Sequence, residues 1–273
     1  MQAKIERLAV LGAGKMGVTL LSALSASGVV DPKNIVATAR HESRRASVGA
    51  KYGVATSRDN RQAVESADVV LLCVKPQTAG QVVEEVREHL SPQQVLLSIV
   101  AGLTTEQIEE HLGDREVPVV RAMPNTPSRI GQGMTAVCGG RYANENHLEL
   151  GRAIFSQIGR SLILEERYFD AVTGLSASGP AFLYIVIEAL AEGGVKMGLP
   201  RQVATELAAQ TCLGAGHMVL ETGDHPALLK DEVTTPAGCT MDGILALETG
   251  GLRVTLINAV VQAGRRAAGL VDE

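Results

Sequence analysis

Short runs of Val, Leu and Ile alternate with amphipathic stretches through the first half of the chain. The apolar runs show no polar alternation, which is typical of strands buried on both faces of a parallel sheet. They predict strands at Leu8–Leu11, Ile35–Ala39, Val54–Thr56, Val69–Val74, Val95–Val100, Val117–Ala122 and Thr135–Cys138. The stretches between them predict helices at Met16–Ala26, Arg44–Tyr52, Arg61–Ser66, Ala79–Leu90 and Glu106–Leu112. This alternation indicates right-handed crossovers and a doubly wound α/β domain.

The second half of the chain carries long helical patterns that are interrupted by Gly and Pro. They predict helices at Ala181–Met197, Arg201–Glu221, Pro226–Val233, Met241–Glu248 and Leu252–Leu270. Apolar residues are spread around most of the circumference of the last of these helices, which therefore needs partners on nearly all sides. We predict two domains, residues 1–166 with the sheet and residues 167–273 as an all-helical dimerisation domain, and an obligate homodimer with interleaved helices.

Composition and charge exclude several classes of protein. The 273 residues include 25 Lys and Arg against 30 Asp and Glu, a net charge of −5, whereas a nucleic-acid binder needs a basic surface. Three Phe, four Tyr and no Trp leave few platforms for stacked bases. The six His are dispersed and the four Cys form no CxxC pair, so we expect no metal site and reduced thiols.

The sequence favours a cytoplasmic location. No signal-peptide pattern is visible around Lys4, Glu6 and Arg7. The longest uncharged run, Ala171–Ile187, contains Gly and Pro and is a poor membrane span. We therefore expect a small-molecule substrate and neither a membrane nor a nucleic-acid partner.

A glycine-rich motif directly follows the first predicted strand. It fits G-x-G-x-x-G and reads Gly12-Ala13-Gly14-Lys15-Met16-Gly17. Glycines at these places permit a tight turn and a close approach of the backbone to a pyrophosphate at the positive end of a helix. A turn that merely closes a strand–helix unit is the alternative. The position at the first strand favours dinucleotide binding and thus a Rossmann-type doubly wound parallel sheet.

The end of the second predicted strand favours NADPH as the dinucleotide. Sites for NAD usually place an acidic residue there, whereas sites for NADP supply an Arg. The strand end carries Thr38 and Arg40, with Arg44 and Arg45 close behind and no acidic residue at the discriminating place. Thr38 can hydrogen-bond a 2′-phosphate and Arg40 can pair with it, so we expect NADPH, with NADH as the alternative cofactor. A solvated basic helix start is the competing interpretation.

Further segments with candidate chemistry follow later strands or begin a helix. In an open parallel sheet the ligand lies outside the carboxyl ends of the strands, which places Val74–Pro76, Ser98–Gly102 and Arg121–Pro127 beside the cofactor. In the second domain, Thr235–Thr240 precedes a helix, so that successive backbone amides and the Thr240 hydroxyl can receive a carboxylate. An N-capped helix after a proline turn is the alternative.

Taken together, the motifs resemble those of the pyrroline-5-carboxylate reductase family over nearly the whole chain. They are Gly-x-Gly-x-Met, Val-Lys-Pro-Gln, Ala-Gly, Arg-x-Met-Pro-Asn-x-Pro, Gly174–Ala181 and Thr235–Thr240. The segment Leu229–Pro236 is the most diagnostic part. The resemblance implies reduction of the cyclic imine 1-pyrroline-5-carboxylate to L-proline with NAD(P)H, the last step of proline biosynthesis, and dimers that assemble into rings.

The resemblance also implies a set of site residues. The implied cofactor site comprises Gly12, Ala13, Gly14, Lys15, Met16, Gly17, Thr38, Arg40, Asn60, Val74, Lys75, Pro76 and Ala101. The implied substrate site comprises Glu166, Ser178, Gly238, Cys239 and Thr240. Two positions depart from the family's pattern, because Ala237 replaces the first Gly of the usual Pro-Gly-Gly and Lys15 stands where Asn or Gln is common.

Reduction of a C=N bond requires hydride delivery to carbon and a positive charge on nitrogen. A protonated imine is already electrophilic, so a dedicated acid is optional. We assign Thr240 as the catalytic residue that contacts the ring nitrogen, with proton donation by Thr240 or by water left open. The competing hypotheses are a reductase of another cyclic imine, a β-hydroxyacid-type dehydrogenase, for which Lys196 lies too near the end of its helix, and a nucleotide-binding protein without turnover.

Overall fold

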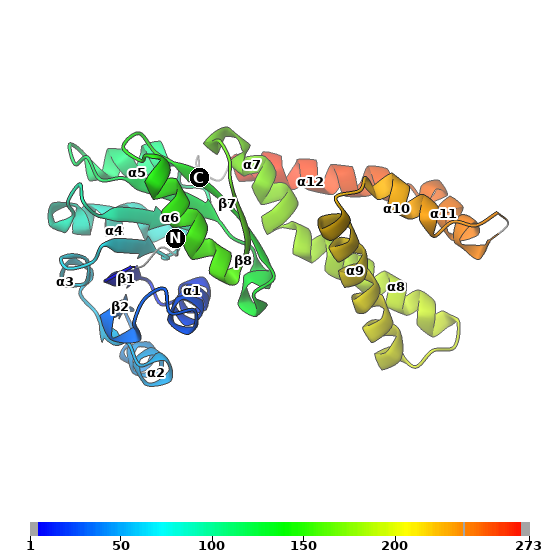
Figure 1. The fold of residues 1–273 in the computed structure, drawn as a ribbon, viewed down its shortest axis with the longest axis horizontal. Helices are drawn as coiled ribbons and strands as arrows, with labels where there is room; N and C mark the ends of the chain where they lie inside the picture. The colour runs from blue at the N-terminus through cyan, green and yellow to red at the C-terminus, as the bar shows by residue number, and fades with distance from the viewer. Residues whose placement is uncertain (1–4, 237, 269–273) are drawn as a thin grey trace. The chain divides into compact units, whose positions relative to one another are not determined.

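The computed structural model describes residues 5–236 and 238–268 (Figure 1). They form two compact units. The sheet unit runs up to Ala177 and includes the chain again from Gly264, and the helical unit is Ser178–Ala263. Sequence reasoning placed a boundary after residue 166 instead. The structural division falls later because Phe169 is buried in the sheet unit against Met123, Ala136 and Cys138.

The sheet unit is built on one eight-stranded sheet with the order β3-β2-β1-β4-β5-β6-β7-β8. The strands are β1 Leu8–Leu11, β2 Ile35–Thr38, β3 Ala55–Ser57, β4 Val69–Leu72, β5 Val95–Ser98, β6 Val119–Met123, β7 Gly133–Gly139 and β8 Gly159–Ile163. Neighbouring strands are parallel except for β6 and β7, which are antiparallel. The sequence did not predict β8, whose residues are half-buried or exposed at the sheet edge and therefore form no continuous apolar run.

Helices cover both faces of this sheet (Figure 1). They are α1 Lys15–Ala26, α2 Glu42–Tyr52, α3 Asn60–Val64, α4 Pro76–Val86, α5 Thr105–Leu112, α6 Glu145–Phe155 and the short α7 Phe169–Val172. Alternate residues of β1 pack in opposite directions. Leu8 and Val10 join a core with α1, α2 and α6, whereas Ala9 and Leu11 join a core with α3, α4 and α5. The sequence predicted the doubly wound arrangement but not α6.

The chain directly before the predicted helix at Ala181–Met197 is also helical. Residues 173–177 form a π-helical segment, and a continuous helical stretch runs over residues 166–196. Pro180 has no amide hydrogen to donate to the carbonyl oxygen of Ser176, four residues earlier. Asn125, in the loop after β6, donates its Nδ2 to that oxygen at 3.1 Å and accepts from the Met134 amide through Oδ1 at 3.0 Å. The proline-rich loop thus compensates for the missing helical hydrogen bond.

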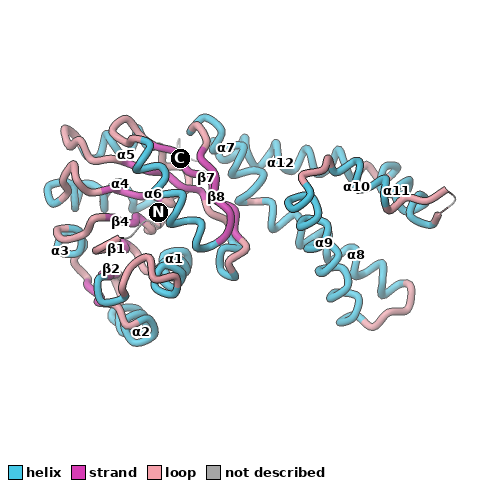
Figure 2. Tube along the Cα trace, in the orientation of Figure 1, coloured by secondary structure: helices cyan, strands magenta, loops and turns pink. Residues whose placement is uncertain are grey.

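The helical unit contains helices and connecting loops over its described residues (Figure 2). Its helices are α8 Gly179–Lys196, α9 Arg201–Thr222, α10 Pro226–Glu232, α11 Cys239–Thr249 and the greater part of α12 Leu252–Ala268. The buried core is small, with Ala191, Ala204 and Ala208 packed beside the half-buried Ile187 and Val195. The bounds of α12 confirm the predicted helix up to Ala268, and the predicted end at Leu270 lies outside the described residues.

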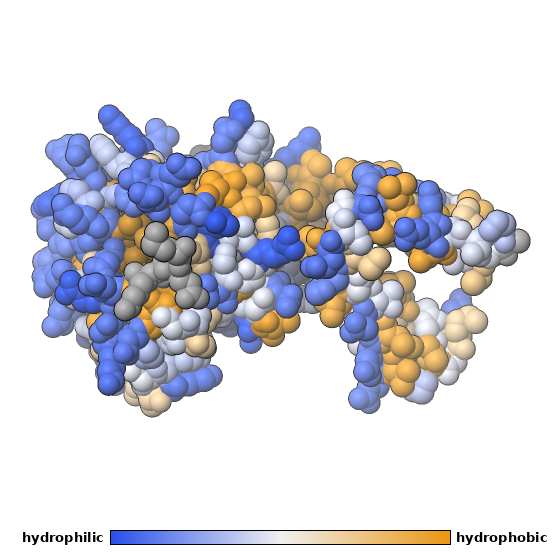
Figure 3. Space-filling model, in the orientation of Figure 1, coloured by the Kyte–Doolittle hydropathy of each residue, from blue (hydrophilic) through white to orange (hydrophobic). Residues whose placement is uncertain are grey.

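Large apolar side chains lie on the surface of this unit in the single chain (Figure 3). Val254, Ile257 and Val261 recur along one side of α12 and are 60%, 56% and 41% exposed. The helical stretch 166–196 is long and apolar enough to cross a membrane by length and composition, and α11 with α12 would qualify as a bent pair. The same features are expected of helices that pack against another subunit, and the α8 part of the stretch contains Pro180 and three Gly residues.

Candidate functional site

Most of the predicted cofactor residues lie in segments that follow strands near the point where the strand order reverses. β1 pairs with β2 on one side and with β4 on the other, so that Leu11 lies opposite Thr38 and Leu72. Leu72 in turn lies opposite Ser98 of β5. The segments after β1, β2, β4 and β5 therefore leave the sheet at one edge. In α/β proteins, ligands bind at such a switch point.

The glycines of the turn after β1 have different surroundings. A Cβ on Gly12, where φ is 98°, would lie 2.9 Å from the Cys73 carbonyl oxygen and from Val74 Cγ1. A Cβ on Gly17 would lie 2.4 Å from the Gly12 carbonyl oxygen. A Cβ on Gly14 would meet nothing within 4 Å. Gly12 and Gly17 are therefore needed for packing, whereas Gly14 leaves the backbone open to a ligand.

The first turn of α1 is suited to a phosphate group. Gly14 is the N-cap of α1 and supplies no side-chain cap, and no acidic residue lies in the first turn. The amides at such a helix start lack intrahelical partners and carry the positive end of the helix dipole. Together with the open space at Gly14, they fit the pyrophosphate of a dinucleotide.

Two residues near the carboxyl end of β2, Thr38 and Arg44, hold the glycine-rich turn in place. Thr38 is 4% exposed, and its Oγ1 accepts from the Gly12 amide at 3.2 Å while its carbonyl oxygen accepts from Ala13 at 2.8 Å. Arg44 donates its Nε to the Ala13 carbonyl oxygen at 2.7 Å. Arg45 donates to the carbonyl oxygens of Ala39 and Arg40. Arg40 itself is exposed, and its pairing with a 2′-phosphate stays a prediction.

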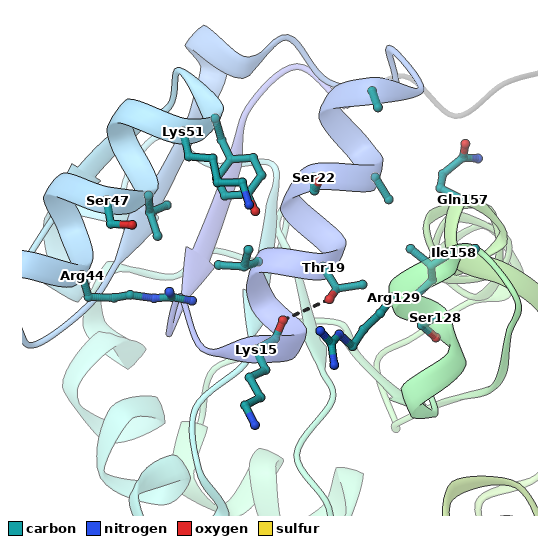
Figure 4. A pocket seen from close by; sticks show the side chains of 16 residues that line it. Lys15, Thr19, Ser22, Arg44, Ser47, Lys51, Ser128, Arg129, Gln157 and Ile158 are labelled. Atoms are coloured by element: carbon teal, nitrogen blue, oxygen red, sulfur yellow. Dashed lines mark hydrogen bonds between the residues drawn. The ribbon is translucent and has the colours of Figure 1, made fainter. Parts of the chain in front are cut away.

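The cavity shown in Figure 4 lies along α1, from Lys15 to Ala26. Its volume is about 660 Å³, and residues of α1, α2 and the segments 128–131 and 157–158 line it. The charged residues that line it are all cationic and comprise Lys15, Arg44, Lys51 and Arg129. The protein has a net charge of −5, but these four cationic side chains make the electrostatic potential locally positive. A positive potential favours a phosphorylated ligand at the neighbouring turn.

The other predicted cofactor residues occupy several positions in the sheet unit. Asn60 begins α3 and donates its Nδ2 to Glu85 Oε2 at 3.0 Å. Lys75 is the N-cap of α4 and Pro76 is its first residue, where a missing amide hydrogen is tolerated. Ala101, in the β5–α5 loop, is half-buried against the cluster of Met123 and Phe169.

The predicted substrate loop lies in the helical unit. Gly238 is the N-cap of α11 and provides no side-chain cap, so the helix begins at Cys239, two residues earlier than predicted. A Cβ on Gly238 would lie 2.4 Å from Thr235 Oγ1, which explains why glycine is needed there. Thr240 is half-buried and Cys239 is exposed in the single chain. Ala237, where the sequence departs from the family's pattern, lies outside the described residues.

Glu166 and Ser178, the remaining predicted substrate residues, belong to different units. Ser178 is the N-cap residue of α8, and its side chain makes no capping hydrogen bond. The carboxylate of Glu166 accepts from the Thr105 amide at 2.9 Å, from the Thr105 hydroxyl and from Arg121 Nη1 at 2.8 Å. Sequence reasoning missed Thr105 and treated Arg121 only as part of a loop motif, although an Arg inside an apolar strand was a visible signal of a buried partner.

The thiols of the sheet unit are unsuited to nucleophilic chemistry. Burial raises the pKa of Cys73 to about 12. Burial also raises the pKa of Cys138 to about 12, and the nearby charge of Glu166 adds to this effect. Both thiols therefore stay protonated at neutral pH. In the described parts of the chain, no group of three His, Cys, Asp or Glu could hold a metal ion.

Comparison with known proteins identifies the family. Residues 166–270 match a family model described as pyrroline-5-carboxylate reductase dimerisation, and residues 7–102 match one described as NADP oxidoreductase, coenzyme F420-dependent. The pyrroline-5-carboxylate reductase of Arabidopsis thaliana is 41% identical over 95% of this chain and 94% of its own length. The chain belongs to the pyrroline-5-carboxylate reductase family.

Solved structures from the family share its fold. The pyrroline-5-carboxylate reductase of Coxiella burnetii is 36% identical with a TM-score of 0.91, covering 97% of this chain and 98% of that one. The Plasmodium falciparum pyrroline carboxylate reductase with NADP bound is 28% identical with a TM-score of 0.87, covering 99% and 100%. The predicted fold class, a Rossmann-type sheet followed by a helical dimerisation domain, is confirmed.

The surroundings of Gly14 and Gly17 predict that substitution by Ala affects cofactor binding at Gly14 and protein stability at Gly17. Gly17→Ala is expected to lower the free energy of unfolding by about 2 kcal/mol, because its methyl group collides with the Gly12 carbonyl oxygen. Gly14→Ala should leave the free energy of unfolding nearly unchanged and raise the Kd for NADPH about tenfold, because its methyl group occupies the space of the pyrophosphate. Denaturant unfolding and fluorescence titration with NADPH measure both quantities. A stable Gly17→Ala, or a Gly14→Ala with unchanged NADPH affinity, would contradict this assignment.

Proposed function

We propose that this chain reduces the C=N bond of 1-pyrroline-5-carboxylate with NADPH to give L-proline, the last step of proline biosynthesis. The observation that carries the proposal is the open backbone at Gly14 at the strand-order reversal, in a chain that belongs to the pyrroline-5-carboxylate reductase family. The family relative with NADP bound supports a phosphorylated dinucleotide as the cofactor. We further propose that the protein acts in the cytoplasm, in keeping with its scattered, unpaired thiols.

The sheet unit would hold the cofactor along its carboxyl edge. The turn Gly12–Gly17 would bind the pyrophosphate through backbone amides, and Arg40 would pair with the 2′-phosphate. Val74, Lys75 and Ala101 follow neighbouring strands and would lie along the rest of the dinucleotide. When bound, NADPH supplies the hydride, and the protein contributes position and electrostatics.

The start of α11 in the helical unit would hold the substrate. Its first amides, at Cys239 and Thr240, would receive the substrate carboxylate at the positive end of the helix. The Thr240 hydroxyl would contact the ring nitrogen, with Ser178 as a further polar contact. The main contribution of these groups is to hold the imine carbon in line for hydride transfer.

Arg40 is expected to determine the choice between NADPH and NADH. Arg40→Ala should raise the KM for NADPH about tenfold or more, because a charge-assisted hydrogen bond is lost, while the KM for NADH stays unchanged. Lys33→Ala removes the same charge before the amino end of β2 and serves as the matched control. Initial rates with both cofactors measure the preference. An unchanged preference in Arg40→Ala would remove this residue from the cofactor site.

Thr240 is expected to act on the substrate and not on the cofactor. Thr240→Val should lower kcat/KM for 1-pyrroline-5-carboxylate about tenfold or more and leave the Kd for NADPH unchanged, because only a contact to the imine is lost. Thr249→Val, at the far end of α11, is the control. Rates with the six-membered homologue of the substrate test the competing imine. Faster turnover of the homologue would reassign the substrate, and full activity of Thr240→Val would exclude Thr240.

We propose that the exposed apolar surface of the helical unit is covered by a second copy of the chain, in a dimer with interleaved helices that can assemble into rings. The dimerisation model over residues 166–270 supports this partner. Ile257 is 56% exposed and lies in the middle of the stripe with Val254 and Val261. Ile257→Asp is expected to dissociate the assembly, because a charge would be buried at the interface. Sedimentation velocity should then show monomers, and a folded, active wild-type monomer would overturn the dimer.

A further inference from the structure

The side-chain amide of Asn125 joins three segments of the sheet unit. Its Oδ1 accepts from the Met134 amide at 3.0 Å, near the start of β7, and its Nδ2 donates to the Ser176 carbonyl oxygen at 3.1 Å. Asn125 is also the N-cap residue of the short 3-10 helix Thr126–Ile130, but its side chain makes no capping hydrogen bond there. The usual capping role of Asn therefore does not explain this side chain.

The orientation of the Asn125 amide is determined by its partners. The backbone N–H of Met134 needs an acceptor, so the oxygen of the amide faces Met134 and the nitrogen faces the Ser176 carbonyl oxygen. Pro124 precedes Asn125 and Pro127 follows two positions later, and their fixed φ angles restrict this loop. The loop after β6 thus presents a firmly held donor to the helical stretch.

The Ser176 carbonyl oxygen lies where the regular pattern of helical hydrogen bonds is interrupted. Residues 173–177 form a π-helical segment. In an α-helix this oxygen would accept from residue 180, which is Pro180 and has no amide hydrogen. In a π-helix it would accept from residue 181, but the Ala181 amide donates to the Ser178 carbonyl oxygen at 3.0 Å. The loop after β6 supplies a donor from outside the helix.

Apolar contacts hold the same segment against the sheet unit. Ala177 packs against the buried cluster that contains Met123 and Phe169, and Ala101, a predicted cofactor residue, packs against this cluster as well. Met123 is the last residue of β6, so the end of one strand contributes an apolar contact and, two residues later, the hydrogen-bond donor. Because β6 runs parallel to β5, these contacts lie at the carboxyl edge of the sheet, where we propose that the cofactor binds.

Ser178 comes directly after the segment that these contacts hold. It is the N-cap residue of α8, and its side chain makes no capping hydrogen bond, so its hydroxyl is available to a ligand. A π-helical turn contains about one residue more than an α-helical turn, and each residue turns an α-helix by about 100°. Conversion of residues 173–177 to an α-helix would therefore change the direction of the Ser178 side chain by a large angle.

We propose that Asn125 is a positioning residue for the substrate. By holding the Ser176 carbonyl oxygen, it keeps residues 173–177 in the π-helical form and so directs the Ser178 hydroxyl to the cyclic imine. The inference rests on the proposed function, because it requires Ser178 to contact this substrate. It adds a residue of the sheet unit that touches neither ligand and acts on the substrate through Ser178.

A double-mutant cycle between Asn125 and Ser178 tests this proposal. Asn125→Ala is expected to lower kcat/KM for 1-pyrroline-5-carboxylate about tenfold, because the substrate is misplaced, and to change the Kd for NADPH less than about twofold. Ser178→Ala should cause a loss of similar size. The double variant should be no less active than the poorer single variant, because both changes remove the same substrate contact. Asn125→Asp keeps the shape and the acceptor but lacks the donor, and it should reproduce the loss.

Asn144→Ala is the matched control. Asn144 caps α6 through its side chain, in a helix that carries none of the predicted site residues. This variant should unfold at lower denaturant concentration and keep the wild-type kcat/KM. Losses that multiply in the double variant would indicate that Asn125 acts independently of Ser178 and would overturn the proposal, as would wild-type kinetics in Asn125→Asp or Ser178→Ala. Failure of the proposed function itself would show separately, as a wild type that does not turn over this imine.

Discussion

The close contact between Gly17 and the Gly12 carbonyl oxygen is the constraint on which the cofactor site depends. It allows α1 to begin directly beyond β1, with its positive end at the edge where the strand order reverses. Gly12 in turn lies against the end of β4, so that the turn and the β4–α4 loop approach each other closely. Gly12 and Gly17 permit this close packing, and Gly14 leaves the backbone open where a phosphate needs its amides.

Three arginines of the sheet unit make supporting contacts within the fold. Arg44 and Arg45 donate to backbone carbonyl oxygens around the turn and the end of β2, and Arg121 pairs with Glu166. The exposed Arg40 is thereby presented on a rigid support. Arg44, Arg45 and Arg121 thus make supporting contacts, whereas Arg40 is free to contact a ligand. This arrangement is consistent with a site in which supporting contacts fix the groups that touch the ligand. It also explains how a protein of net charge −5 can offer a positive binding site.

The sequence predicted seven of the eight strands and most helices, because buried parallel strands and amphipathic helices have clear periodicities. It did not predict β8, an edge strand without an apolar run, or the π-helical segment, in which the Ser176 carbonyl oxygen accepts a hydrogen bond from the distant Asn125. The motifs located the candidate cofactor loops. They could not show that Thr38 holds Gly12 or that Glu166 holds Thr105, because such contacts join residues far apart in sequence. The roles of Arg40 and Thr240 remain predictions.

We propose that this family member transfers hydride from a phosphorylated dinucleotide to the imine carbon of a five-membered ring. A single-turnover reaction with NADPH that carries deuterium at the transferred position of the nicotinamide tests it most directly. The expected product is L-proline with one deuterium on the ring carbon that belonged to the C=N bond, formed in equal amount to the oxidised cofactor. Oxidised cofactor without deuterium in proline, or no proline at all, would contradict it.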